Sequence, residues 1–251
     1  MPKKIVFRAD DLGYSEGVNY GIEKAIRDGL IRSQGVMVNM PATQHGVDLV
    51  KGYDIAFSVH ANICSGRPLT DPELIPSLVT ADGLFKSSST YRAASEDFVV
   101  YEEVLLEVEA QYQRFVELFG RKPDYFEGHA VASANFFKAL EAIAEKYDLT
   151  YSGLPLDFSQ PLTIGQSQVR MNMECMRPDY DPLEMVQRVV SQMTEDVVEL
   201  FVFHPGYLDQ DLLDHSSLTL PRPKEVAMLI ASATKEWLKE QRVELIDYRD
   251  L

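Results

Sequence analysis

Two adjacent carboxylates, Asp10 and Asp11, follow an apolar run near the start of the chain. The run, residues 5–9, has the composition of a buried strand, and Gly13 directly after the acids marks a turn into a helix. Because side chains alternate along a strand, we expect the two carboxylates to point in different directions and to have different roles. One could bind a metal while the other handles protons. The pair could equally form a turn and cap the next helix, with Ser15 as a competing cap.

Three of the five histidines, His60, His129 and His204, lie at or just beyond the carboxyl ends of strand-like runs. A single histidine is as often structural as it is a ligand. The carboxyl ends of parallel strands, however, converge on one mouth of a barrel, where active sites collect. The shared placement therefore favours one site that also contains Asp10 and Asp11.

A carboxylate and two imidazoles suit a divalent metal that keeps open positions for water and substrate, as catalytic zinc does. Magnesium or manganese would prefer more oxygen ligands, so the identity of the metal stays open. The charge on such an ion can activate water and polarise a carbonyl group. A free carboxylate nearby could take the water proton, and a histidine across the site could protonate a leaving amine.

Strands and helices alternate along the 251 residues, with short connections. This alternation predicts an α/β fold with a parallel sheet, and the number of units favours a distorted, TIM-like (β/α) barrel of seven or eight parallel strands. We expect one domain over residues 1–251. The predicted strands cover residues 4–10, 35–39, 55–63, 125–130, 149–153, 167–171, 197–203 and 243–248, and the predicted helices cover residues 16–29, 41–51, 102–119, 135–147, 182–193 and 224–240.

Residues 64–98 interrupt this alternation with prolines, glycines and a serine cluster. Loops of this length inside a compact domain are usually functional or mobile. Because the segment follows a strand with a candidate ligand, it could form a wall or a lid over the site. It could equally be a solvated excursion with one short helix at residues 73–79.

Composition excludes several classes of partner. The net charge of −15 opposes binding to nucleic acid or to anionic membranes.

No apolar stretch approaches the length of a bilayer span, and the N-terminus has no signal-peptide pattern, so we expect a cytoplasmic protein. Cys64 and Cys175 lack metal or disulfide spacing and are expected to be small buried side chains in a reducing compartment.

The motifs together resemble the YdjC/ChbG-like carbohydrate deacetylases, within the wider group of polysaccharide-deacetylase-type barrels. The resemblance spans nearly the whole chain. It rests on Ala9-Asp10-Asp11-Leu12-Gly13, Val59-His60-Ala61-Asn62, Glu127-Gly128-His129 and His204-Pro205-Gly206-Tyr207, and more weakly on Arg222-Pro223-Lys224-Glu225.

The resemblance implies that Asp11, His60 and His129 bind one divalent metal ion, Mg²⁺ or Zn²⁺. It further implies that Asp10 is the general base and that His204 is the general acid. The implied reaction removes acetate from N-acetylated sugars, typically short chitin-derived oligosaccharides such as diacetylchitobiose or its phosphate, and a homodimer is a family expectation. In family members, the histidine that corresponds to His129 is often followed by further histidines, whereas residues 130–133 of this chain contain none. This departure affects the expected contacts with the substrate more than it affects metal binding.

Four further residues are candidate substrate contacts. Tyr14 and Tyr207 lie next to motifs and could stack on sugar faces. Asn62 lies two residues after His60 on the same face. Arg170 could orient the catalytic carboxylate from a neighbouring strand end, or be a surface arginine.

Two other functions remain open at this stage. One is a metal-dependent phosphoesterase, although no cluster of lysine or arginine accompanies the motifs. The other is a non-catalytic sugar-binding protein.

Overall fold

A mostly parallel, strongly curved sheet forms the centre of the computed structural model, which describes residues 3–155 and 157–251. Neighbouring strands follow the order β5-β4-β3-β2-β1-β8-β7-β6, and β9 pairs with the first half of β1. The nine strands of the described residues are β1 (Lys3–Leu12), β2 (Ser33–Val36), β3 (Ala56–Ala61), β4 (Tyr125–Gly128), β5 (Thr150–Tyr151), β6 (Leu162–Ile164), β7 (Ser167–Asn172), β8 (Val198–Phe203) and β9 (Val243–Ile246).

Eight of these strands pair in parallel, and only β6 runs antiparallel, to β7. The sheet forms a nearly closed barrel, which confirms the predicted fold class. Within the described part of the chain, no pairing joins β5 to β6 or β7, so the barrel is open there.

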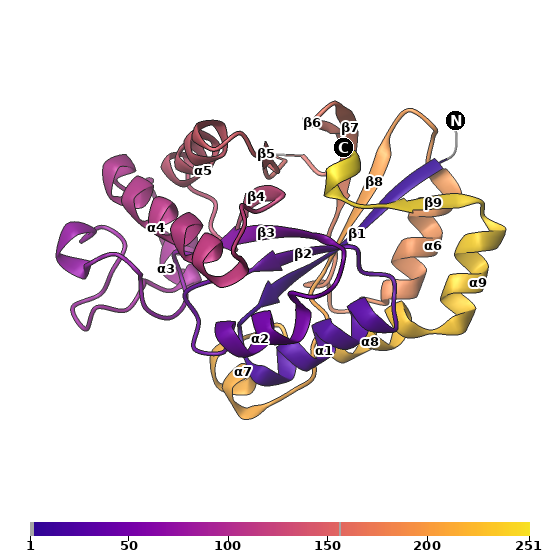
Figure 1. Ribbon diagram of the computed structural model, residues 1–251, viewed down its shortest axis with the longest axis horizontal. Helices are drawn as coiled ribbons and strands as arrows, with labels where there is room; N and C mark the ends of the chain where they lie inside the picture. Colours follow the sequence, from indigo (N-terminus) through magenta and orange to yellow (C-terminus); the bar gives the residue numbers. More distant parts are fainter. Residues whose placement is uncertain (1–2, 156) are drawn as a thin grey trace.

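Helices cover the outside of the sheet (Figure 1). Helices α1, α2 and α8 pack together along one side, and α4 packs on α5 along another. The helices of the described residues are α1 (Glu16–Arg27), α2 (Thr43–Val50), α3 (Ser88–Ala93), α4 (Tyr101–Phe119), α5 (Ala134–Lys146), α6 (Pro182–Gln192), α7 (Gln210–His215), α8 (Pro221–Ile230) and α9 (Ser232–Glu240).

Alternation along the strands separates two apolar cores. On β1, Phe7 belongs to the larger core between sheet and helices, whereas Val6 belongs to a smaller core inside the barrel. Arg8 and Asp10 have the same parity as Val6 and therefore point inward. The barrel interior is thus apolar at one end and charged toward the carboxyl ends of the strands.

Several boundaries differ from the sequence prediction. The predicted helix at 224–240 is two helices, because Ala231 takes an extended backbone (φ −64°, ψ 129°) that ends α8 and starts α9. The predicted helix at 73–79 is only a 3₁₀ turn, Pro72–Leu74, since Pro76 has no N–H and disfavours helix before it. No pattern in the sequence predicted α3, α7 or β6, the strand that pairs with the predicted β7.

The segment at residues 64–98 is tied to the helices beside it. The buried Glu107 carboxylate on α4 accepts the backbone N–H groups of Leu69 and Thr70 (2.8–3.2 Å). At its other end, Asp97 accepts a hydrogen bond from Ser133 Oγ at the start of α5 (2.9 Å). These contacts hold the segment against α4 and α5. Among the described residues, no helix is long and apolar enough to span a membrane.

Candidate active site

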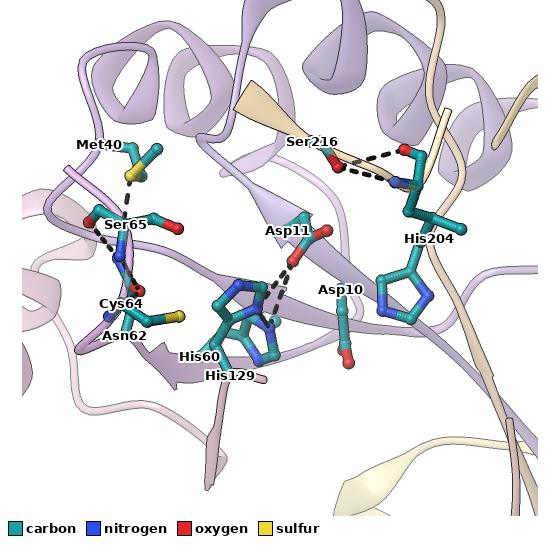
Figure 2. A network of polar contacts seen from close by, with 12 residues as sticks. Asp10, Asp11, Met40, His60, Asn62, Cys64, Ser65, His129, His204 and Ser216 are labelled. Atoms are coloured by element: carbon teal, nitrogen blue, oxygen red, sulfur yellow. Dashed lines mark hydrogen bonds and ion pairs between the residues drawn. The ribbon is translucent and has the colours of Figure 1, made fainter. Parts of the chain in front are cut away.

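Asp11, His60 and His129 meet at the carboxyl ends of β1, β3 and β4 (Figure 2). Asp11 Oδ1 lies 3.3 Å from His60 Nε2 and 3.3 Å from His129 Nδ1. The two imidazole nitrogens are 2.9 Å apart, and the rings meet edge to face. The three side chains therefore direct their ligand atoms at one point.

The backbone of Asp11 brings its carboxylate to this point. Its φ is +75°, and the β1–β2 pairing shifts register between Ala9 and Leu12. Gly13 follows with φ +102°, where a Cβ atom would lie 2.6 Å from the Met37 carbonyl oxygen. Strict alternation would send Asp11 to the outer face, so this local distortion is what brings the Asp11 carboxylate to the mouth beside Asp10.

Arg222 holds the other oxygen of Asp11. Its Nη2 donates to Asp11 Oδ2 at 2.7 Å, and both side chains are almost fully buried. Burial acts to raise the pKa of Asp11, but Arg222 and the two histidines outweigh it and keep the pKa well below its usual range. Asp11 is therefore ionised, with Oδ1 directed at the imidazoles.

Glu127 lies on β4 behind His60, and His129 follows two residues later, just past the end of β4. Both of its carboxylate oxygens are 2.7 Å from His60 Nδ1. Burial opposes ionisation of Glu127, but His60 and Arg8 lower its pKa. This contact directs the second nitrogen of His60, Nε2, toward Asp11.

Arg8 joins the two inward-facing carboxylates inside the barrel. Its Nη2 donates to Asp10 Oδ2 at 2.8 Å and lies 3.8 Å from Glu127. Its Nη1 donates to Tyr248 Oη at 3.0 Å. The Asp10 oxygen that Arg8 does not bind, Oδ1, is buried without a hydrogen-bond partner.

Gly35 on β2 makes room for these groups. A Cβ atom there would lie 2.8 Å from Glu127 Oε1, 3.1 Å from Asp10 Oδ1 and 3.2 Å from His60 Cβ. Any side chain at this position would displace the carboxylates, so glycine is required here.

His204 lies across Asp10 from the imidazole pair (Figure 2). Its Nδ1 is 3.5 Å from Cys175 Sγ, and its backbone N–H donates to Glu225 (2.6 Å). Burial lowers the pKa of His204 to about 4, against the opposing effect of Asp11 and Asp10. The imidazole is therefore neutral at neutral pH.

The donor set fits a divalent cation. The ligand atoms of Asp11, His60 and His129 lie within 4.8 Å of one another, and the buried Asp11 Oδ1 faces the two imidazole nitrogens at 3.3 Å. One carboxylate oxygen and two imidazole nitrogens leave coordination positions open for water and substrate. A second grouping, Asp10, His60 and Glu127, is as compact, but Arg8 already pairs with both of its carboxylates.

The family comparison agrees with the motifs at this site. The model of the YdjC-like protein family matches residues 4–240. The chain belongs to the YdjC-like family. It is 34% identical to Carbohydrate deacetylase 2 of Listeria innocua, over 99% of this chain and 98% of that protein. It is 30% identical to the carbohydrate deacetylase of Geobacillus stearothermophilus, over 100% of this chain and 98% of that protein.

Solved structures share the fold. A protein of Enterococcus faecalis V583 named for cellobiose-phosphate cleavage superposes with a TM-score of 0.84 at 24% identity, over 100% of this chain and 99% of that one. A family 4 acetyl xylan esterase of Clostridium thermocellum gives a TM-score of 0.51 at 12% identity, over 99% of this chain and 89% of that one. At these identities the likeness concerns the fold alone.

The four candidate substrate contacts of this YdjC-like chain lie in different surroundings. Tyr14 is partly buried, and the Arg222 guanidinium lies over its ring, 5.6 Å from the centre of the tyrosine ring. Tyr14 is thus next to the site. Tyr207 is exposed on the loop after β8, where its backbone N–H donates to Gly17. Asn62 is fully buried, and its side chain accepts the backbone N–H groups of Cys64 and Ser65, so it shapes the loop after β3.

Arg170 does not orient the catalytic carboxylate. It lies on the outer face of β7, where its Nη1 donates to Glu199 at 2.8 Å. The arginine that holds Asp10 is Arg8, which the sequence analysis missed together with the partner of His60, Glu127. Both precede a motif residue by two positions, so strand alternation places them on its face. That spacing was the available signal.

Proposed function

We propose that this YdjC-like protein is a metal-dependent carbohydrate deacetylase that removes acetyl groups from N-acetylated sugars. The observation that carries the proposal is the convergence of Asp11, His60 and His129, with Asp10 and His204 beside them. The names of the two deacetylase relatives, similar over their whole length, support the reaction class. The cobalt ion named for the esterase structure is consistent with a metal on this fold.

In this proposal, Asp11, His60 and His129 hold one divalent ion, Mg²⁺ or Zn²⁺. When bound, the ion supplies Lewis acidity, which polarises the acetyl carbonyl and lowers the pKa of water. Glu127 orients His60, and Arg222 fixes Asp11 through the oxygen that does not face the histidines. Such supporting contacts set both ligand orientation and ligand basicity.

Asp10 is the proposed general base. Arg8 occupies its Oδ2, whereas Oδ1 is buried and has no partner. Oδ1 is therefore the atom that can accept a proton from the attacking water molecule. Arg8 keeps the carboxylate in the orientation that leaves this oxygen available.

His204 is the proposed general acid. Because its imidazole is neutral at neutral pH, the proton for the departing amine has to enter the site during the reaction. The attacking water molecule is its source. Asp10 takes this proton up and passes it to His204, on its other side; the imidazolium so formed gives the proton to the amide nitrogen as the C–N bond breaks, and both residues return to their starting states.

The substrates we propose are short chitin-derived oligosaccharides, such as diacetylchitobiose or its phosphate. Tyr14 beside Arg222 and the exposed Tyr207 are the aromatic rings proposed to stack on the sugars. We further propose that the protein acts in the cytoplasm as a homodimer.

Acetate release tests the proposal. Chelated protein, alone and after addition of Zn²⁺, Mg²⁺ or Mn²⁺, is incubated with N-acetylglucosamine, diacetylchitobiose, their 6-phosphates and longer chitin oligomers. We expect metal-dependent release from at least one of these. His129→Ala should lose both metal and activity. Stoichiometric metal binding without acetate release from any of them would contradict a deacetylase acting on these sugars.

A further inference from the structure

One turn of α8 holds the backbone of His204 from both sides of the residue. Glu225 Oε2 accepts the His204 backbone N–H at 2.6 Å. Arg222, three residues earlier on the same helix face, points its Nη1 at the His204 carbonyl oxygen at 3.4 Å while its Nη2 binds Asp11. The same helix turn therefore contacts His204 and the aspartate of the proposed metal site.

The burial of the Glu225 carboxyl group is energetically unfavourable. Its side chain is fully buried, and burial raises its pKa to about 8. A buried carboxyl group is tolerated only where hydrogen bonds compensate for lost hydration. Glu225 has two such bonds: one from the His204 backbone and one from Tyr180 Oη, at 2.8 Å. Neither contact belongs to the regular hydrogen bonding of a helix or strand.

The chain beyond His204 is also fixed. Gly206 packs on α1 so closely that a Cβ atom at Gly21 would lie 2.4 Å from the Gly206 Cα. Pro205 between them has no N–H to donate. The His204 N–H, at 2.6 Å from Glu225, is thus the shorter of the two contacts that set the end of β8 relative to α8. A shift of this peptide would carry the imidazole with it.

We propose that Glu225 is a positioning residue for His204: by holding the His204 N–H it fixes where the imidazole stands relative to Asp10. The inference rests on the role proposed for His204 in the deacetylase reaction. Glu225 itself does not touch the reacting groups. Its effect should therefore fall on turnover and on the environment of His204, and not on metal binding.

The variants are Glu225→Ala, which removes the acceptor, and Glu225→Gln, which keeps an acceptor oxygen. Glu199→Gln is the matched control, since Glu199 is also fully buried and accepts two side-chain hydrogen bonds. It lies five residues before His204 on the opposite face of β8. Should Glu225→Ala fail to fold, Glu225→Asp, one methylene shorter, takes its place.

The first measurement uses histidine-selective ¹⁵N labelling, because the chain has only five histidines. In Glu225→Ala we expect the His204 amide proton to move upfield and the His204 ring signals to change, while His60 and His129 keep theirs. Glu199→Gln should leave all five unchanged. If His204 keeps its signals in Glu225→Ala, or if all five histidines change, the positioning role is refuted, whatever the substrate proves to be.

The second measurement is turnover of the substrate found in the acetate assay. A misplaced catalytic group costs up to roughly 100-fold in rate, so we expect kcat of Glu225→Ala to fall roughly 10- to 100-fold. KM and bound metal should stay within about twofold of wild type, and Glu225→Gln should restore most of kcat. Unchanged kcat in Glu225→Ala would overturn the proposal. A wild-type protein inactive on every sugar would instead refute the proposed function, and the histidine spectra would still decide the role of Glu225.

Discussion

Replacement of Glu127 tests whether the contact behind His60 serves a metal ligand. Both Glu127 oxygens lie 2.7 Å from His60 Nδ1, and the carboxylate also faces Arg8 at 3.8 Å. In Glu127→Gln, the amide oxygen can still accept the Nδ1–H bond but the negative charge is lost. In Glu127→Ala, the bond is lost as well, so His60 is free to turn or to change tautomer.

Loss of such a partner behind a metal-binding histidine typically weakens metal affinity by about 10- to 100-fold. This corresponds to about 1.4 to 2.7 kcal/mol. Because Glu127→Gln keeps the hydrogen bond, we expect it near the lower figure and Glu127→Ala near the upper one. Calorimetric titration of the chelated protein with Zn²⁺ measures both, and denaturation by urea measures whether the variants remain folded.

Glu199→Gln is again the control, since it removes a buried carboxylate from the outer face of the sheet. We expect its zinc affinity to equal that of wild type. If both Glu127 variants bind zinc as tightly as wild type, His60 does not depend on Glu127 for its orientation. The orienting role proposed for Glu127 would then be wrong.

Three further predictions follow from contacts inside the barrel. Arg8→Met leaves Asp10 buried without its partner, so the free energy of unfolding should fall by about 3 to 5 kcal/mol in urea denaturation; a loss under 1 kcal/mol would contradict this. Asp10→Asn should abolish acetate release but keep zinc binding, and full activity in this variant would rule out Asp10 as the base. Burial raises the pKa of Glu225 to about 8 in the folded state, whereas its pKa is 4.5 in the unfolded chain. Between pH 4.5 and 8, wild type should therefore lose stability relative to Glu225→Gln as pH rises, by at most about 1.4 kcal/mol per pH unit; a parallel pH dependence would show that Glu225 titrates normally.

Strand alternation accounts for the part of the site that the sequence could predict. His60, His129 and His204 lie at or just after the carboxyl ends of β3, β4 and β8, and hydrophobic patterning locates those strands within a few residues. Their convergence follows from the parallel sheet alone. Patterning also separates the two cores, because it depends only on which residues are apolar.

The remaining parts depend on contacts between distant residues. Asp10 and Asp11 have different partners, as expected, but a regular strand would have placed Asp11 on the outer face, and its positive φ instead brings it to the mouth. Arg222 is 211 positions from the aspartate that it holds. Arg170 and Arg8 both lie on strands and close to carboxylates. Arg8 reaches Asp10 because it points into the barrel, whereas Arg170 points to the outer face of the sheet. No local pattern encodes these pairings.

The buried charges of the site also determine how many ions it should hold. Asp10, Asp11 and Glu127 are three carboxylates facing two guanidinium groups, those of Arg8 and Arg222. Against the effect of burial, the carboxylates around them raise the pKa values of His60 and His129 in the metal-free protein, but as metal ligands both imidazoles would be neutral. The cluster would then contribute one negative charge, and one divalent cation would leave it with one positive charge. That charge is matched when one negative charge develops on a substrate oxygen, which favours the transition state over the neutral amide.

A second divalent ion would break this balance. It would have to use Asp10, His60 and Glu127, whose carboxylates already pair with Arg8 at 2.8 and 3.8 Å. Repulsion from Arg8 and from the first ion would then act in a buried site, where charges are poorly screened. We therefore expect one equivalent of zinc per chain by elemental analysis after dialysis, and still one in Asp10→Asn. Two tightly held equivalents in wild type, reduced to one in Asp10→Asn, would show that Arg8 yields its carboxylates to a second ion, and the charge balance argued here would be wrong.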